Sequence, residues 1–285
     1  PTTLLPGFLD EPVVIVKSES SIACLSNVCT HRGKILVEEP CAADLIKCRY
    51  HGRRFSLDGT FLSMPEFEGV NNFPCESDNL QYLAFTERAG FMFASIEPVD
   101  SFEAFAGDTE ERLKDVETDG LRLSGTKSYE IDAHWALYCE NYLEGFHIPF
   151  VHRSLNELID YGTYTTELFR YSSLQTGFNE KGEVVARYLF IFPNLMFNYY
   201  PWGISVNVVN PITSSKTNVD FFTYTRDTSE TGAGDDLHAV EMEDEAVVES
   251  VQQGIRSRFY THGRYSPTRE QGTHNFHRLI AEFMG

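Results

Sequence analysis

The chain has 285 residues, of which 42% are hydrophobic, so it is long enough to form two domains with buried cores. Its formal net charge of −19 at pH 7 argues against nucleic acid or an anionic membrane as a partner. No apolar run is long enough to span a bilayer, and so we expect no membrane segment.

The first third of the chain has the pattern of short strands separated by turns. Residues 13–16 form an apolar run, residues 57–60 contain an Asp-Gly turn of the hairpin type, and residues 90–96 have the pattern of a closing strand that Pro98 stops. Because no helical periodicity interrupts these segments, we predict a small all-β domain over residues 1–98.

The pattern changes after residue 98, and we predict a second domain over residues 99–285. Here segments with helical character accompany a run in which aromatic, aliphatic and polar side chains alternate, as they do in antiparallel strands. The predicted elements are a helical connector at 101–116, a strand at 127–133, a helix at 135–146, strands within 183–226, a loop at 231–236 and a helix at 237–259. The predicted fold class is therefore α+β, with helices packed on a sheet.

Residues that commonly bind metals occur in the β domain with the spacing C-x-H and C-x-x-H: Cys29, His31, Cys48 and His51. Two thiolates and two imidazoles can hold the irons of a [2Fe–2S] cluster, and the same residue types can hold one structural zinc ion. The spacing alone favours neither the [2Fe–2S] cluster nor the zinc ion. Gly33 and Gly52 favour the cluster, because glycines let two tight loops close over the metal and aim N–H groups at sulfur. Short β segments flank both loops, whereas zinc fingers usually supply histidines from a helix.

A second group of metal-binding residues lies in the other predicted domain: Glu144, His147 and His152. On one continuous helix, Glu140, Glu144 and His147 would share a face, and His152 would leave it. Pro149 lies between the two histidines, and we expect it to disrupt the helix so that both imidazoles converge. Two histidines and one carboxylate, with open positions for O₂, are typical of a non-haem Fe(II) site.

We predict that Asp244 is the carboxylate of this site. In the helix predicted at 237–259, four apolar residues define a stripe that should be buried: Val240, Val247, Val251 and Ile255. Asp244 falls on this stripe between the first two, and a buried carboxylate requires a compensating partner such as a metal. Its acidic neighbours Glu241, Glu243 and Glu245 are expected to point to solvent.

The two metal-binding patterns together resemble the α subunits of Rieske non-haem iron oxygenases. Cys-Thr-His-Arg-Gly and Cys-Arg-Tyr-His-Gly are similar to the two Rieske loops. Rieske proteins of respiratory complexes carry an extra cysteine in each loop, and Lys34 and Tyr50 in those places point to the oxygenase and ferredoxin branch. The segment Glu-Asn-Tyr-Leu-Glu-Gly-Phe-His that ends at His147 is most similar to the choline, carnitine and betaine monooxygenase branch.

The resemblance implies a Rieske [2Fe–2S] domain followed by a catalytic domain with a helix-grip-like antiparallel sheet. Cys29 and Cys48 would bind one cluster iron and His31 and His51 the other. The mononuclear Fe(II) would be held by His147, His152 and Asp244. Members of the family form homotrimers in which a carboxylate bridges the cluster of one subunit and the iron of its neighbour. Glu144 stands where that bridge belongs, and His51 would be its partner on the cluster side.

The function that this resemblance implies is an oxygenase component that hydroxylates or oxidatively demethylates a small organic substrate. Electrons would come from a separate NAD(P)H-dependent reductase or ferredoxin, since the chain has no dinucleotide-binding fingerprint. Aromatic residues in one segment could cage a quaternary ammonium group, although most are expected to fill the core of the sheet: Tyr188, Phe190, Phe192, Phe197, Tyr199, Tyr200 and Trp202. The cysteines show no disulfide framework and no signal peptide precedes them, so a reducing cytoplasm is the expected location.

Three other functions fit parts of the pattern. An aromatic-ring-hydroxylating dioxygenase would use the same two metal centres and the same aromatic residue types. A Rieske electron carrier would need only the β domain, and the second ligand set argues against it. A zinc-stabilised binding protein would use the same four cysteine and histidine residues without redox chemistry.

Overall fold

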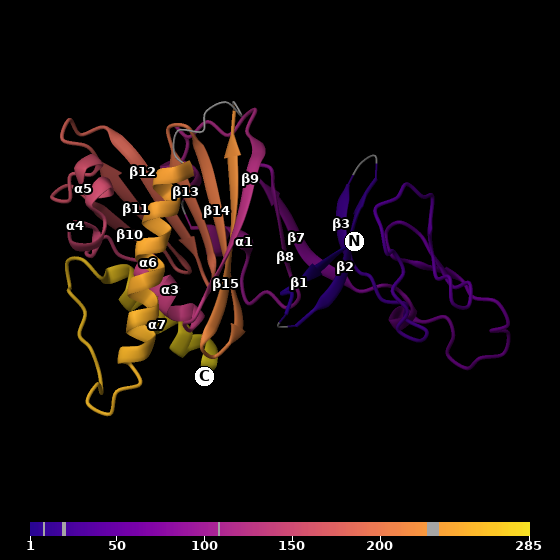
Figure 1. Cartoon of the computed structure of the whole chain (residues 1–285). Helices are drawn as coiled ribbons and strands as arrows, with labels where there is room; N and C mark the ends of the chain where they lie inside the picture. Colours follow the sequence, from indigo (N-terminus) through magenta and orange to yellow (C-terminus); the bar gives the residue numbers. More distant parts are fainter. Residues whose placement is uncertain (8, 19–20, 108, 227–233) are drawn as a thin grey trace. The chain divides into compact units, whose positions relative to one another are not determined.

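The computed structural model describes residues 1–285 except 8, 19–20, 108 and 227–233 (Figure 1). The chain divides into two compact units, Pro1–Val99 and Asp100–Gly285, with two antiparallel sheets in the first and one in the second. The fold is α+β, as predicted. None of the described helices combines the length and the apolar character that a membrane span requires.

The first unit contains a five-stranded and a three-stranded sheet. The larger sheet has the order β1 (Thr2–Leu4), β2 (Glu11–Lys17), β3 (Ile22–Ser26), β7 (Tyr82–Arg88) and β8 (Phe91–Ser95). Val13 packs with Leu83 in one core cluster and Val14 with Leu25 in another, so both faces of β2 are buried. This burial explains why the strand has an unbroken apolar run instead of an alternating pattern.

The smaller sheet consists of β4 (Ile46–Lys47), β5 (Arg54–Phe55) and β6 (Phe61–Ser63). The predicted Asp-Gly turn joins β5 and β6, and Gly59 adopts the left-handed backbone (φ +80°) that such turns need. The only helical segment that the structure describes in this unit is a single 3₁₀ turn at Glu76–Asp78. The prediction of a small β domain is confirmed.

The second unit is built on a seven-stranded antiparallel sheet. Its order is β10 (Thr165–Leu168), β11 (Ser172–Phe178), β12 (Val184–Ile191), β13 (Leu195–Tyr200), β14 (Gly203–Thr213), β15 (Lys216–Thr225) and β9 (Arg122–Ile131). The strands predicted within 183–226 correspond to β12–β15. Figure 1 shows α6 (Gly234–Gly254) running across one face of this sheet.

Three helices bury side chains against this sheet. Tyr138 of α3 (Trp135–Tyr142), Val248 of α6 and Phe276 of α7 (Gln271–Met284) belong to one core cluster with residues of the strands. Phe276 is 1% exposed, and its ring meets those of Phe190 and Trp135 edge-on. The helix α7 has no counterpart among the predicted elements, although its buried positions 272, 276 and 279 follow a helical spacing that could have revealed it.

The predicted connector at 101–116 forms two short helices, α1 (Phe102–Ala106) and α2 (Thr109–Arg112). Gly107 separates them with a left-handed backbone (φ +69°), and a Cβ atom there would lie 2.7 Å from the side chain of Phe169. The loop predicted at 231–236 lies partly outside the described residues, and α6 already begins at Gly234.

Candidate active site

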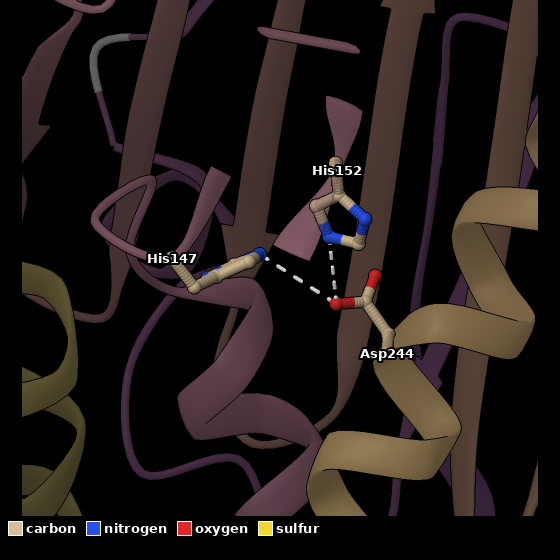
Figure 2. Close-up of side chains that lie close together, drawn as sticks. All are labelled: His147, His152 and Asp244. Atoms are coloured by element: carbon tan, nitrogen blue, oxygen red, sulfur yellow. Dashed lines mark hydrogen bonds and ion pairs between the residues drawn. The ribbon is translucent and has the colours of Figure 1, made fainter. Parts of the chain in front are cut away.

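Three side chains from separate segments of the second unit converge on one point (Figure 2). His147 and His152 turn their Nε2 atoms toward the same oxygen of Asp244, at 3.5 Å and 3.0 Å. One potential ligand atom from each residue lies within 4.8 Å of the others. His152 is 1% exposed, and the other two side chains are mostly buried. These residues could therefore hold a single metal ion.

The opposite nitrogen of each imidazole is held by a glutamate. His147 Nδ1 lies 2.6 Å from Glu144 Oε1, and His152 Nδ1 lies 2.7 Å from Glu243 Oε2. A carboxylate accepts a hydrogen bond from Nδ1–H, and this fixes the tautomer in which the Nε2 lone pair faces the metal. Two nitrogens and one carboxylate oxygen on one side of an ion suit Fe(II) with open positions for O₂. The residues present therefore fit a mononuclear iron.

The helix predicted at 135–146 ends early. α3 stops at Tyr142, and the chain continues through a bend in which Gly145 passes close to Tyr164. A Cβ atom on Gly145 would lie 2.7 Å from the Tyr164 ring, so this bend requires glycine. The prediction that Glu140, Glu144 and His147 share one helical face is therefore wrong. Glu140 instead lies 2.8 Å from His277 Nε2 on α7.

Pro149 has a different role from the predicted one. It lies in the first turn of the short helix α4 (Ile148–Val151). A backbone N–H at that position has no partner within the helix, so proline, which has no N–H, costs no hydrogen bond there. His147 stands at the N-terminal end of α4, and His152 lies between α4 and α5 (Arg153–Leu158). The two imidazoles converge because they flank this single turn, whereas we expected Pro149 to disrupt one continuous helix.

The buried face of α6 also differs from the predicted apolar stripe. The helix ends at Gly254 instead of 259, and Val251 and Ile255 are about two-fifths exposed. Among the side chains of α6 whose burial the structure describes, the buried ones are Glu241, Val248 and Gln252. Asp244 nevertheless projects from α6 toward the histidines, because position 244 lies one turn from both 241 and 248.

The expectation that Glu241, Glu243 and Glu245 point to solvent is wrong for Glu241, and it holds only in part for Glu243, whose side chain is 43% exposed. Glu241 is 6% exposed, and both of its oxygens accept hydrogen bonds from Tyr138 Oη at 2.9 Å. Burial, reinforced by the charge of Asp244, raises the pKa of Glu241 well above its usual value. Glu243 orients His152, and Glu245 Oε1 is buried without a hydrogen-bond partner in the described part of the chain.

A cavity of about 410 Å³ opens onto the candidate metal site. Tyr188, Tyr200 and Trp202 line it, whereas Phe190 and Phe192 belong to the core of the unit. The Tyr200 and Trp202 rings are stacked at 4.9 Å with an interplanar angle of 10°, and Tyr188 meets Tyr200 edge-on at 6.1 Å. Removal from solvent raises the pKa of Tyr188 to about 12, so its phenol is neutral at physiological pH. The cavity has the size of a small-molecule site.

The first unit presents its four predicted ligands on two loops of similar geometry. Each cysteine carbonyl accepts a hydrogen bond from a glycine four residues later, Gly33 to Cys29 at 3.0 Å and Gly52 to Cys48 at 3.1 Å. Both glycines have left-handed backbones, with φ of +70° and +77°. The tight loops predicted from these glycines are therefore present.

The side chains on these loops fit a cluster. The rings of His31 and His51 lie 4.8 Å apart, and the Cys29 and Cys48 side chains are almost fully buried. His51 Nδ1 is buried with no hydrogen-bond partner among the described residues, as expected of an atom that binds a metal. Burial and then the charge of His51 lower the pKa of His31, which favours the neutral imidazole that a metal requires.

Arg53 joins the two loops, and sequence analysis did not identify it. Its guanidinium is 2% exposed, donates to Thr30 Oγ1 at 2.9 Å and forms an ion pair with Asp78. Thr30 belongs to the first loop and Arg53 follows the second, so this contact fixes one loop against the other. The signal that could have found it is a positive charge directly after the glycine of a metal-binding loop.

Family models match both units. Residues 6–74 match the Rieske [2Fe-2S] domain, and residues 118–285 match the catalytic domain of the ring-hydroxylating α subunit. The chain belongs to the Rieske non-haem iron oxygenases. It therefore uses the two cofactors of this family, a [2Fe–2S] cluster and a mononuclear iron.

Relatives of this oxygenase include enzymes that oxidise quaternary ammonium compounds. Choline monooxygenase from Arabidopsis thaliana is 30% identical over 95% of the chain and 71% of its own length, and the Beta vulgaris enzyme is 27% identical with 66% of its length matched. The carnitine monooxygenase oxygenase subunit of Escherichia coli K12 is 28% identical over 96% of the chain and 81% of its own length.

Solved structures agree with this assignment. A crystal structure of the quaternary ammonium Rieske monooxygenase CntA superposes with a TM-score of 0.77 at 26% identity, covering 97% of this chain and 83% of CntA. Naphthalene 1,2-dioxygenase from Rhodococcus shares the fold, with a TM-score of 0.71 at 18% identity over 95% of this chain and 83% of that chain. The predicted family, fold class and cofactors are confirmed.

Proposed function

We propose that this oxygenase hydroxylates a C–H bond of a small quaternary ammonium compound. The observation that carries the proposal is the position of the candidate iron site at a cavity lined by Tyr188, Tyr200 and Trp202. Aromatic faces attract quaternary ammonium groups through cation–π interactions. The curated relatives named above, which act on choline and carnitine, support the same substrate class.

We also propose which residues hold the metals. Cys29 and Cys48 would bind one cluster iron and His31 and His51 the other, in a domain that ends at residue 98. His147, His152 and Asp244 would bind the mononuclear iron in a catalytic domain over 99–285. The iron, when bound, supplies reductive activation of O₂. Each turnover would take up two electrons and two protons, place one oxygen atom in the substrate and release the other as water.

Glu144 is the proposed bridge for electrons between the two kinds of metal centre. Its Oε1 lies 2.6 Å from His147 Nδ1, and its Oε2 accepts a hydrogen bond from the backbone N–H of His147 at 3.1 Å. These bonds hold the carboxylate in one orientation beside the ligand. In a homotrimer, the same carboxylate would accept a hydrogen bond from His51 of the partner subunit and so connect it to the iron site.

The chain's partners and location complete the proposal. A separate NAD(P)H-dependent reductase or ferredoxin would supply the electrons. All six cysteines are free in the described structure, which is consistent with a reducing cytoplasm. Cys24 and Cys139 are buried small side chains of the two cores.

Two measurements test this function. Iron, sulfide and zinc analysis, with absorption spectra before and after dithionite, should give about three irons and two sulfides per chain. About two irons would instead indicate an electron carrier, and zinc a binding protein.

With a reductase present, choline or carnitine should stimulate O₂ uptake. Stimulation by an aromatic acid, and by neither quaternary amine, would instead identify a ring-hydroxylating enzyme.

A further inference from the structure

Glu241 lies in the substrate cavity but has no place in the metal site. It lines the cavity, is 6% exposed, and accepts hydrogen bonds from Tyr138 through both oxygens. The candidate iron ligands gather around Asp244, one turn away on α6, and Glu241 is not among them. A buried carboxylate is costly unless a positive charge accompanies it, and burial without such a charge raises the pKa of Glu241 so that it keeps its proton. A cation bound beside Glu241 would favour its ionised form.

The described residues that line the cavity include three carboxylates: Glu144, Glu241 and Asp244. They include no arginine or lysine, and the two histidines present their Nε2 atoms to the metal site. A divalent iron would offset the charges of Glu144 and Asp244. Glu241 is then the lining carboxylate without a partner charge, and a substrate with a single positive charge would stabilise its ionised form.

The rest of the cavity wall is aromatic or neutral and polar. Tyr188, Tyr200 and Trp202 contribute aromatic rings to it, and such rings attract the methyl groups around a cationic nitrogen. Ser205 and Asn207 are buried in the same wall, where Ser205 Oγ donates to Asn207 Oδ1 at 2.9 Å. The serine oxygen can still accept, and the asparagine NH₂ can still donate, a hydrogen bond with a neutral polar group such as an alcohol. A substrate carboxylate would find no cationic partner among these lining residues.

We propose that Glu241 is the counter-charge for the substrate, and that the substrate is a quaternary ammonium alcohol without a carboxylate. This inference rests on the proposed function and narrows it, because carnitine and betaines are zwitterions. A zwitterion adds no net charge to the cavity, and it would bury its own carboxylate beside those of Glu144 and Glu241. Choline has the required charge and an alcohol group.

Binding to the iron-loaded enzyme under anaerobic conditions tests the proposal, with equilibrium dialysis as the readout. The probes are choline, L-carnitine and 3,3-dimethylbutan-1-ol, which is the neutral carbon analogue of choline. Wild-type enzyme should bind choline at least about tenfold more tightly than either of the others, since a desolvated charge pair contributes that much or more. E241Q should weaken choline binding by about tenfold or more and change the Kd of the neutral analogue by less than about threefold.

E249Q is the matched control. Glu249 lies on the same helix and accepts a hydrogen bond from the backbone N–H of Asp132 at 2.9 Å, which glutamine preserves. It does not line the cavity, so the same loss of charge should leave choline binding unchanged. A selective loss in E241Q separates a counter-charge from a structural role, because a distorted cavity would weaken choline and its neutral analogue alike.

The outcomes distinguish this inference from the proposed function. If wild-type enzyme binds carnitine as tightly as choline, or if E241Q binds choline normally, the counter-charge proposal is overturned and the quaternary ammonium function stands. If iron-loaded enzyme binds neither quaternary amine, both proposals are overturned. The wild-type comparison of choline with carnitine remains decisive even if E241Q fails to fold.

Discussion

Replacing Gly272 by alanine should loosen the part of the catalytic unit that carries the iron ligands. Gly272 lies in the first turn of α7, where the helix meets the end of α3. A Cβ atom there would lie 2.3 Å from the carbonyl oxygen of Leu143, and such contacts are not observed below 3.0 Å. One backbone must therefore move by roughly 0.7 Å or more, since neither atom belongs to a flexible side chain.

The expected loss of stability follows from two opposing terms. Overpacking of this kind costs about 3 kcal/mol, the upper end of its usual range, because the obstacle is backbone. Alanine favours a helix over glycine by about 1 kcal/mol, so the net loss is about 2 kcal/mol. For a domain of this size that corresponds to a fall in Tm of about 4–8 °C. Because Leu143 directly precedes Glu144, we also expect a reduced content of mononuclear iron.

Calorimetry and metal analysis on the same preparation measure both effects. Gly254→Ala is the matched control, because a Cβ atom at that position on α6 would meet nothing within 4 Å. This control should unfold at or slightly above the wild-type Tm. If Gly272→Ala unfolds like the wild type and keeps its iron, then close contact between α7 and the end of α3 is not needed to hold the iron ligands in place.

Three further predictions concern single side chains. Asp244→Ala should lose the mononuclear iron and keep the absorption spectrum of the cluster; retained iron would show that another carboxylate is the ligand. Glu144→Gln should keep both metal centres, yet a reduced cluster should no longer deliver electrons to the iron in single-turnover experiments; normal turnover would exclude the bridging role. Tyr188 should lose its proton near pH 12, whereas in the unfolded chain it does so near pH 10. The stability gained by keeping this phenol neutral is present below pH 10 and is lost as the pH rises toward 12. Tyr188→Phe should therefore flatten the fall in the free energy of unfolding over that range in urea titrations, and an unchanged slope would contradict the assigned pKa.

The parts of the site that could be predicted were those set by local geometry. The predicted cluster ligands could be recognised as one set because each Cys-His pair lies within a few positions of a glycine that closes a tight loop. These ligands are Cys29, His31, Cys48 and His51. The structure contains those loops with the expected left-handed glycines. Asp244 was selected from an apolar stripe that proved wrong, yet it lies with the histidines because the buried face of α6 passes through the same position.

The predictions that failed depend on contacts between distant segments. α3 ends at Tyr142, and in the bend that follows Gly145 approaches Tyr164, which belongs to another part of the chain. Glu241 and Glu243 look like solvated residues in the sequence, since a run of acidic side chains on a helix is normally exposed. Their roles depend on Tyr138 and His152, which only the folded chain brings to α6.

By itself, the sequence determined the two-part organisation, the β character of the first unit and the residue types available to bind metals. Short-range spacing carries that information, because turns, strands and ligand pairs are set by residues close together in the chain. Only the tertiary structure decided which acidic side chains of α6 are buried, which aromatic rings line the cavity and where α7 docks. Burial is a property of the partner surface as much as of the helix, and no local pattern specifies that partner.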